Sequence, residues 1–196
     1  MQDDSIRHIL NEHRDIIYKI INSDKIKSSI HKIIDIVINC LENKNKILLA
    51  GNGGSAADSE HMCGELMGKL CFEREGLPAI SLTSDSSLIT AISNDLSFES
   101  IFSKQIKALC QEGDVVIFYS TSGTSKNILK AILQTNLSKG IPIGFTGING
   151  VKMAEQCKAS IIIPSSSTQR VQEAHHLINH IICEIVEKNI FRKKLD

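Results

Sequence analysis

The chain has 196 residues, with 22 basic and 22 acidic side chains and therefore no formal net charge. Apolar residues make up 42% of it, which is typical of a globular protein and excludes a disordered or fibrous one. A neutral chain also lacks the basic excess of most nucleic-acid-binding proteins, so we expect no nucleic-acid partner.

The first part of the chain predicts two helices. Isoleucine and leucine recur at helical spacing over residues 3–22 and again over residues 25–42. Asp24 stands where it can cap the second helix. The two helices form a helical hairpin, 3–42, that precedes any strand. Its apolar stripe must pack on the rest of the chain or on another subunit.

After residue 45 the pattern changes to short, continuous apolar runs separated by helical segments. The runs predict five strands at residues 46–51, 78–82, 114–120, 141–147 and 159–164. The helical segments span about 55–70, 86–109, 125–138, 150–156 and 168–192. Strands in which apolar residues do not alternate with polar ones are typical of a parallel sheet covered on both faces. We therefore predict a three-layer α/β/α sandwich with the flavodoxin-like strand order 2-1-3-4-5. We expect a single domain over residues 1–196, with its α/β core at 45–192.

A glycine-rich loop, GNGGSA at residues 51–56, follows the first strand and opens a helix. Ligands bind at the carboxyl ends of strands in such sheets. Glycines let a backbone approach a ligand, and a helix N-terminus offers free N–H groups to an anion. The loop matches neither the dinucleotide-binding fingerprint nor the P-loop, so a tight turn capped by Ser55 is the structural alternative.

A serine-rich loop, STSGTS at residues 120–125, follows the third strand. Its five hydroxyl groups surround one glycine, which is more than a helix cap needs. Hydroxyls and backbone amides at a helix start suit a phosphate monoester without any Lys or Arg; a simple capped loop is the alternative. A third segment, SND at residues 93–95, ends a helix and carries polar groups suited to sugar hydroxyls.

A set of metal-ligand types lies on two of the predicted helices. His61 and Glu65 are four residues apart on the helix after the first loop, so they share one face. Gln172 and His180 are eight residues apart on the last helix, so their directions differ by about 80°. Two imidazoles, a carboxylate and an amide oxygen suit zinc or a neighbouring transition metal.

Two further histidines on the last helix, His175 and His176, compete for the same role. Gln172 and His176 are themselves four residues apart and share a face. Spacing alone leaves the ligand set open, and an ordinary core or surface position is the alternative for each residue taken singly.

The N-terminus is acidic and lacks the apolar stretch of a signal peptide, and no apolar run is long enough to span a membrane. The chain has six cysteines and no C-x-x-C pair. We therefore expect reduced, buried thiols in a cytoplasmic protein without a membrane partner.

Five segments occur in an order and at spacings that are specific. They are GNGGSAADSEHMCGEL (51–66), LPAISL (77–82), ISNDLSFESIFSKQI (92–106), STSGTSKNI (120–128) and TQRVQEAHHLINH (168–180). On these segments the chain resembles, over essentially its full length, the sugar isomerase (SIS) domain family, and within it the phosphoheptose isomerases. The resemblance implies an aldose–ketose isomerase that converts sedoheptulose 7-phosphate into D-glycero-D-manno-heptose 7-phosphate. That is the first step of nucleotide-activated heptose synthesis for lipopolysaccharide, capsule or another glycan.

The resemblance also implies a cytoplasmic homotetramer with active sites between subunits and one zinc ion per subunit. The positions that match the family's zinc ligands are His61, Glu65, Gln172 and His180. Those that match its substrate-binding residues are Asn52, Gly53, Gly54, Ser55, Glu65, Asn94, Asp95, Ser120, Thr121, Ser122, Ser125 and Gln172. Glu65 matches the base and His180 its acid partner in an enediol mechanism.

Two alternatives stay open. One is a non-catalytic SIS protein that binds a replication initiator; such relatives lack the base and metal positions, whereas Glu65 and His180 are present here. The other is an isomerase for a different sugar phosphate. Lys69 stands where the family commonly has Arg, so either Lys69 or Arg74 is the candidate for a substrate contact.

Overall fold

A five-stranded parallel sheet lies at the centre of the computed structural model, which describes residues 2–192. Its strands are β1 (Ile47–Gly51), β2 (Ala79–Ser81), β3 (Val115–Ser120), β4 (Ile141–Gly147) and β5 (Ala159–Ile163). Their order, β2-β1-β3-β4-β5, confirms the predicted topology. The order reverses between β1 and β3, and such a switch point is where ligands bind in open parallel sheets.

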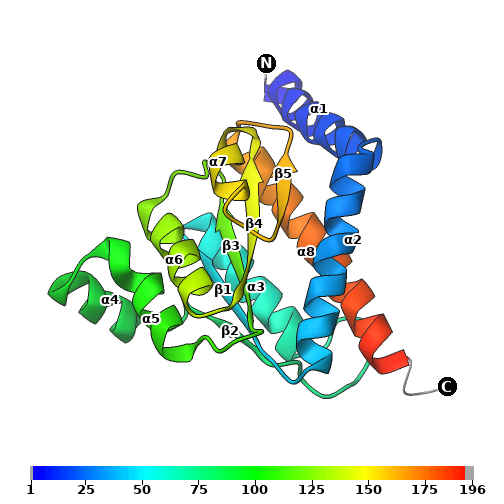
Figure 1. Cartoon of the computed structure of the whole chain (residues 1–196). Helices are drawn as coiled ribbons and strands as arrows, with labels where there is room; N and C mark the ends of the chain where they lie inside the picture. Colours follow the sequence, from blue (N-terminus) through cyan, green and yellow to red (C-terminus); the bar gives the residue numbers. More distant parts are fainter. Residues whose placement is uncertain (1, 193–196) are drawn as a thin grey trace.

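Helices cover both faces of the sheet and confirm the three-layer α/β/α sandwich (Figure 1). One layer contains α1 (Gln2–Ile21), α2 (Asp24–Glu42), α3 (Gly54–Met67) and α8 (Thr168–Arg192). The other contains α4 (Ser86–Asp95), α5 (Ile101–Leu109), α6 (Lys126–Leu137) and α7 (Val151–Ala154). Two short 3-10 turns, η1 (Phe98–Ser100) and η2 (Ile148–Gly150), precede α5 and α7. No helix among the described residues is both long and apolar enough to cross a membrane.

The strands are continuously apolar because both of their faces are buried. In β1, Leu49 points to the core under α3 and α8, whereas Leu48 and Ala50 point to the core under α5 and α6. Leu49 pairs with Ile117 of β3, which is equally buried. Burying one such side chain contributes about 1.5–3 kcal/mol, so a polar residue is costly at every position of these strands.

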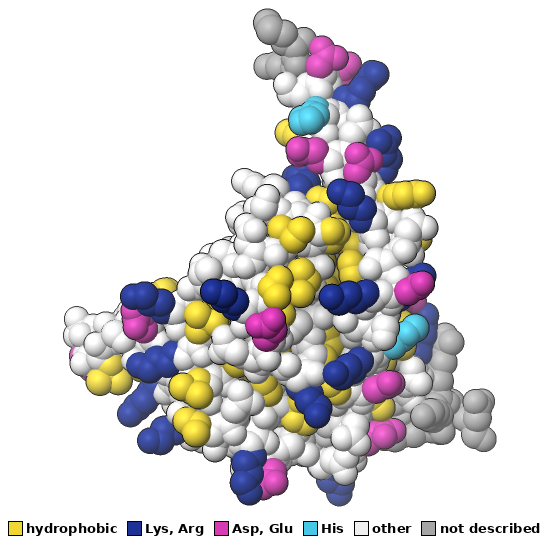
Figure 2. All heavy atoms as spheres, turned by 45° about the horizontal axis from the view of Figure 1, so that its top comes forward, with side chains coloured by type: hydrophobic (Ala, Val, Ile, Leu, Met, Phe, Trp, Pro, Cys, Tyr) yellow, Lys and Arg dark blue, Asp and Glu magenta, His cyan; other side chains and the backbone are white. Residues whose placement is uncertain are grey.

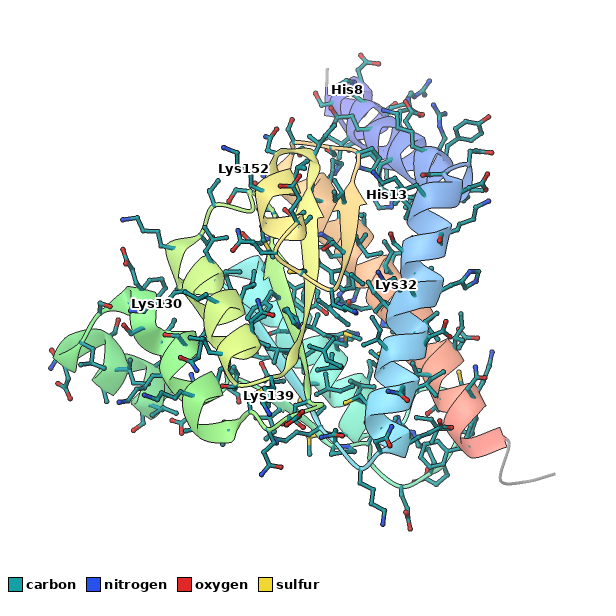
Figure 3. The ribbon with its side chains drawn as sticks, in the orientation of Figure 1. His8, His13, Lys32, Lys130, Lys139 and Lys152 are labelled. Carbon is teal, nitrogen blue, oxygen red and sulfur yellow. The ribbon has the colours of Figure 1, made fainter. Side chains whose placement is uncertain are left out.

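The predicted helical hairpin is present as α1 and α2. Its C-terminal part is tied to the rest of the layer, because Ile16 and Ile20 are buried and His13 Nδ1 lies 2.8 Å from Glu173 Oε2 on α8 (Figure 3). The first half of α1 instead projects beyond the body of the molecule (Figures 1 and 2). The apolar stripe of α1 is therefore only partly covered within one chain.

Several predicted helix ends are wrong, because local hydrogen bonds decide them. The N-cap of α2 is Ser23, whose Oγ accepts the Ile26 N–H at 3.3 Å, and Asp24 is the first helical residue. The single helix predicted over residues 86–109 is broken after Asp95. Here a serine in extended backbone, Ser97, interrupts the helical run, as residues that hydrogen-bond locally often do.

Lys130 of α6 reaches the turn after that break (Figure 3). Its Nζ donates to Ser100 Oγ at 3.0 Å, which joins η1 to α6. η1 and α5 therefore pack beside α6, and α4 packs on η1 and α5 (Figure 1).

All six cysteines are free thiols, as expected. Burial raises the pKa of Cys40 to about 11 and that of Cys183 to about 12, so both stay protonated at neutral pH. The expectation of burial is wrong for Cys71, which is exposed in the segment after α3.

Candidate functional site

The glycine-rich loop turns the chain sharply from β1 into α3. A Cβ at position 51 would lie 2.1 Å from the Ser55 carbonyl oxygen, so only glycine fits there. Gly53 has a φ of +58° and is the N-cap of α3, without a side-chain cap hydrogen bond. Ser55 lies inside α3, so the alternative of a turn capped by Ser55 is wrong. Gly53 and Gly54 are exposed, so their own amides are open to a ligand. The N–H groups of Ser55 and Ala56 instead donate to the carbonyl oxygens of Asn52 and Gly53, each at 3.0 Å.

Asn52 is held by a partner that sequence reasoning missed. Its amide exchanges two hydrogen bonds, of 2.9 and 2.8 Å, with the amide of Asn127 at the start of α6. Asn127 is buried, and its Oδ1 also accepts the Ile128 N–H at 3.0 Å. The pair joins the glycine-rich loop to the serine-rich loop. Its only sequence signal was the asparagine two positions after STSGTS.

The serine-rich loop forms a cup at the start of α6. Gly123, with a φ of +67°, donates its N–H to Ser120 Oγ at 3.2 Å, and Ser120 Oγ donates to Ser125 Oγ at 3.3 Å. Ser120 is buried, whereas Ser122 and Thr124 are exposed. Ser120 thus shapes the loop, and the exposed hydroxyls of Ser122 and Thr124 lie 2.9 Å apart at its surface.

Three histidines from two helices, α3 and α8, lie close together. His61 on α3 and His180 on α8 face each other with their Nε2 atoms 2.8 Å apart. His176 completes the cluster, and one ring nitrogen of each residue lies within 4.8 Å of the others. Glu65 Oε1 lies 3.4 Å from His61 Nε2, and its side chain is 19% exposed. The predicted approach of His61, Glu65 and His180 is therefore found.

The electrostatics of the cluster keep an imidazole neutral. Burial lowers the pKa of His61, the His176 and His180 rings lower it further, and the Glu65 carboxylate opposes them. A neutral imidazole is the form that binds a metal ion. Three imidazole rings with an adjacent carboxylate are donor types that suit zinc, so the side chains fit that ion.

A buried carboxylate, that of Asp58, contacts the Nδ1 side of the His176 ring. Asp58 Oδ1 lies 3.4 Å from His176 Nδ1, and burial raises the pKa of Asp58 against the opposing effect of His176. The neighbouring His175 faces the core instead, where it lies against the rings of Tyr119 and Phe145. Of the two competing histidines, the structure brings only His176 into the cluster.

Gln172 lies one turn before His176, against the glycine-rich loop. A Cβ on Gly54 would come within 2.6 Å of the Gln172 amide nitrogen, so the absence of a side chain there makes room for this amide. Gln172 therefore faces the N-terminus of α3.

The predicted sugar-binding pair lies elsewhere in the chain. Asn94 and Asp95 are exposed at the end of α4, where Asn94 Nδ2 donates to Asp95 Oδ1 at 2.8 Å. α4 belongs to the layer on the other side of the sheet from α3 and α8 (Figure 1). One chain by itself does not bring this pair to the histidines.

Arg74 has a structural partner that the sequence did not reveal. Its guanidinium pairs with Glu187 of α8 at 2.9 Å, and both side chains are nearly fully buried, at 2% and 1% exposed. It also donates to the carbonyl oxygen of Glu65 at 2.7 Å and so fixes the end of α3. Arg74 is thus excluded as a free substrate contact, and Lys69 is exposed and paired with Glu73 at 2.6 Å.

Glu187→Gln is expected to lower the free energy of unfolding by about 3–5 kcal/mol, because Arg74 would stay buried without its counter-charge. Burial alone raises the pKa of Glu187, but hydrogen bonds from the amides of Leu70 and Cys71 and from Arg74 outweigh it and lower the pKa. The stabilisation is therefore complete above the usual carboxyl pKa and is lost as the pH falls through the lower folded value. Urea unfolding at one protein concentration, at pH 7 and in acid, measures this difference.

The matched control is Glu184→Gln, one turn earlier on α8, where the carboxylate pairs with Lys188 and is half-exposed. This change is expected to cost less than about 1 kcal/mol. An equal loss in both variants would contradict the role of the buried pair.

Comparison with known proteins gives the same family for the whole chain. The SIS domain family matches residues 10–147. The chain is 41% identical to the phosphoheptose isomerase of Burkholderia pseudomallei, over 99% of this chain and 100% of that protein. It is 46% identical to that of Aneurinibacillus thermoaerophilus, over 89% of this chain and 88% of that protein.

Solved structures agree. A phosphoheptose isomerase from Neisseria gonorrhoeae matches with a TM-score of 0.89 and 32% identity, over 96% of this chain and 100% of that one. One from Francisella tularensis matches with a TM-score of 0.91 and 31% identity, over 96% and 99%. With its glycine- and serine-rich loops at the switch point of a parallel sheet, this chain belongs to the phosphoheptose isomerase family of SIS-domain enzymes.

Proposed function

We propose that this chain is the aldose–ketose isomerase that converts sedoheptulose 7-phosphate into D-glycero-D-manno-heptose 7-phosphate. The observation that carries the proposal is the approach of His61, His180 and Glu65 between α3 and α8. An imidazole and a carboxylate that lie close together can serve as the acid and the base that an enediol reaction requires. This reading is favoured over the non-catalytic initiator-binding protein and over an isomerase for another sugar, because the named relatives are phosphoheptose isomerases.

The reaction moves one proton between C1 and C2 of the sugar. In our proposal the Glu65 carboxylate takes this proton and returns it to the neighbouring carbon. His180 donates a proton to the C2 oxygen of the ketose, on which negative charge develops, and takes a proton back from the C1 hydroxyl as the aldehyde forms. Glu65 is only partly exposed, which limits the access of competing water.

We propose zinc as the cofactor, held by His61, Glu65, Gln172 and His180. The bound ion supplies a Lewis acid that stabilises charge on the sugar oxygens. The donor types fit zinc, and Gln172 lies beside Gly54, on the side of the cluster toward the glycine-rich loop.

The loops take the rest of the substrate in this proposal. The loop of Ser120, Thr121, Ser122 and Ser125 binds the phosphate at the start of α6 through its backbone amides and more exposed hydroxyls, while the buried Ser120 hydroxyl holds the loop in shape. Asn52, Gly53, Gly54 and Ser55 line the sugar from the start of α3, and Glu65 and Gln172 contact it near the reacting carbons. The hydrogen bonds of Ser120 support this assignment, because they hold the serine-rich loop in one shape before the substrate binds.

Asn94 and Asp95 bind sugar hydroxyls only if another subunit supplies them. Their place on the opposite layer therefore supports a homotetramer with active sites between subunits. The exposed apolar side chains of α1 support the same assembly, with Leu10 64% exposed. They are Ile6, Ile9, Leu10, Tyr18 and Ile21.

Light scattering at micromolar concentration is expected to give four times the chain mass of 21.6 kDa. Leu10→Lys would place a charge on the exposed stripe, and we expect it to shift the protein to smaller species. A clean monomer of the unaltered chain would contradict the proposed assembly.

We place the enzyme in the cytoplasm, at the start of nucleotide-activated heptose synthesis. The test of the function is a substrate panel. Zinc-loaded protein is incubated with sedoheptulose 7-phosphate, fructose 6-phosphate and ribulose 5-phosphate, and products are followed by NMR. We expect kcat/KM to be highest for the seven-carbon substrate. A shorter ketose phosphate as the best substrate would overturn the proposed specificity.

A further inference from the structure

His176 is the one member of the imidazole cluster that the proposed zinc set does not use. Its ring centroid lies 4.3 Å from that of His61 and 4.8 Å from that of His180. One ring nitrogen of each of the three residues lies within 4.8 Å of the others. His176 is thus as close to His61 and His180 as a third ligand to the same ion would need to be.

Asp58 gives His176 the orientation of a ligand. Metal-binding histidines usually donate their second ring N–H to a carboxylate, which fixes the tautomer and makes the other nitrogen a better donor. His176 Nδ1 lies 3.4 Å from Asp58 Oδ1, so Nε2 is left for an ion. The Asp58 side chain is only 7% exposed, and its Oδ2 has no hydrogen-bond partner among the described residues.

We propose that His176 is a zinc ligand, so that three imidazoles, from His61, His176 and His180, hold the cofactor of this enzyme. The inference rests on the proposed isomerase function for its zinc ion, but it concerns the ligand set and not the reaction. Asp58 is the positioning residue that holds the His176 ring.

A third imidazole resolves a conflict at Glu65. A carboxylate bound to a cation is a weaker base than a free one, yet Glu65 is the proposed base. With His176 as a ligand, three imidazoles would hold the ion without the Glu65 carboxylate. That carboxylate would then be free to act as the base.

X-ray absorption at the zinc edge tests the ligand set directly. We expect three imidazoles around zinc in the unaltered protein and two in His176→Gln. Zinc affinity, from competition with a chromophoric chelator, is expected to fall at least about 10-fold in His176→Gln and about 10-fold in Asp58→Asn. The matched control is His31→Gln on the exposed face of α2, which is expected to leave both readouts unchanged.

Two imidazoles in the unaltered protein would overturn the inference, as would equal zinc affinity in His176→Gln and the unaltered protein. The absorption spectrum of the unaltered protein needs no variant, so a folding defect does not obscure it. Isomerisation of sedoheptulose 7-phosphate is measured on the same sample. Activity with two imidazoles refutes this inference alone, and three imidazoles without activity refute the proposed function alone.

Discussion

Glu65→Gln is expected to lower kcat for sedoheptulose 7-phosphate by about 10²–10⁴-fold, the usual contribution of a general base. Glutamine keeps the size and polarity of the side chain but cannot take a proton. KM is expected to change much less, because the phosphate and hydroxyl contacts lie on other residues. Steady-state kinetics with zinc content measured on the same sample give the result.

The matched control for this variant is Glu60→Gln. Glu60 is exposed on the same helix, α3, and accepts a hydrogen bond from Thr83 at 2.8 Å, away from the histidines. We expect it to keep kcat within about twofold of the unaltered enzyme, as usual for a surface change. Near-normal turnover by zinc-loaded Glu65→Gln would show that Glu65 is not the base.

Removal of the metal is expected to lower kcat at least about 100-fold, because stabilisation of charge on the reacting oxygens is worth several kcal/mol. Added zinc should restore the activity. Magnesium should not, since the clustered donors His61, His176 and His180 are imidazoles, and magnesium prefers oxygen ligands.

Elemental analysis before and after chelation is the control for this experiment. Circular dichroism shows whether the fold survives without the ion. Full activity in protein verified to be free of metal would remove zinc from the proposed mechanism.

The sheet could be predicted from sequence because its signal is local and repeated. β1 and β3 are continuous apolar runs, and such runs separated by helices leave few topologies other than a doubly wound sheet. The break after Asp95 was missed because its cause is one backbone conformation, the extended Ser97, which periodicity does not report. Helix ends depend on single hydrogen bonds, such as the one that makes Ser23 the cap of α2.

The candidate site was predicted where its residues share one helix or one loop. His61 and Glu65 lie together on α3, as four-residue spacing requires. Contacts between distant segments were not predictable in this way. Asn52 meets Asn127 across 75 positions, and Arg74 meets Glu187 across 113, and neither pair has a spacing rule.

The place of His176 in the cluster also could not be predicted from residue spacing. Spacing gave Gln172 and His176, or Gln172 and His180, as equally good pairs on α8. Only the packing of α8 on α3 shows that both His176 and His180 face His61. Asp58 of α3 could not be recognised from the sequence as a partner of His176, because the two residues meet only through the packing of α3 on α8.

Proton transfer between C1 and C2 of a seven-carbon sugar phosphate can be followed by NMR of sedoheptulose 7-phosphate with zinc-loaded protein in deuterium oxide. We expect D-glycero-D-manno-heptose 7-phosphate to form with deuterium at its C2, because the proton on Glu65 exchanges with solvent. No aldose after prolonged incubation with zinc-loaded, folded protein would contradict this expectation.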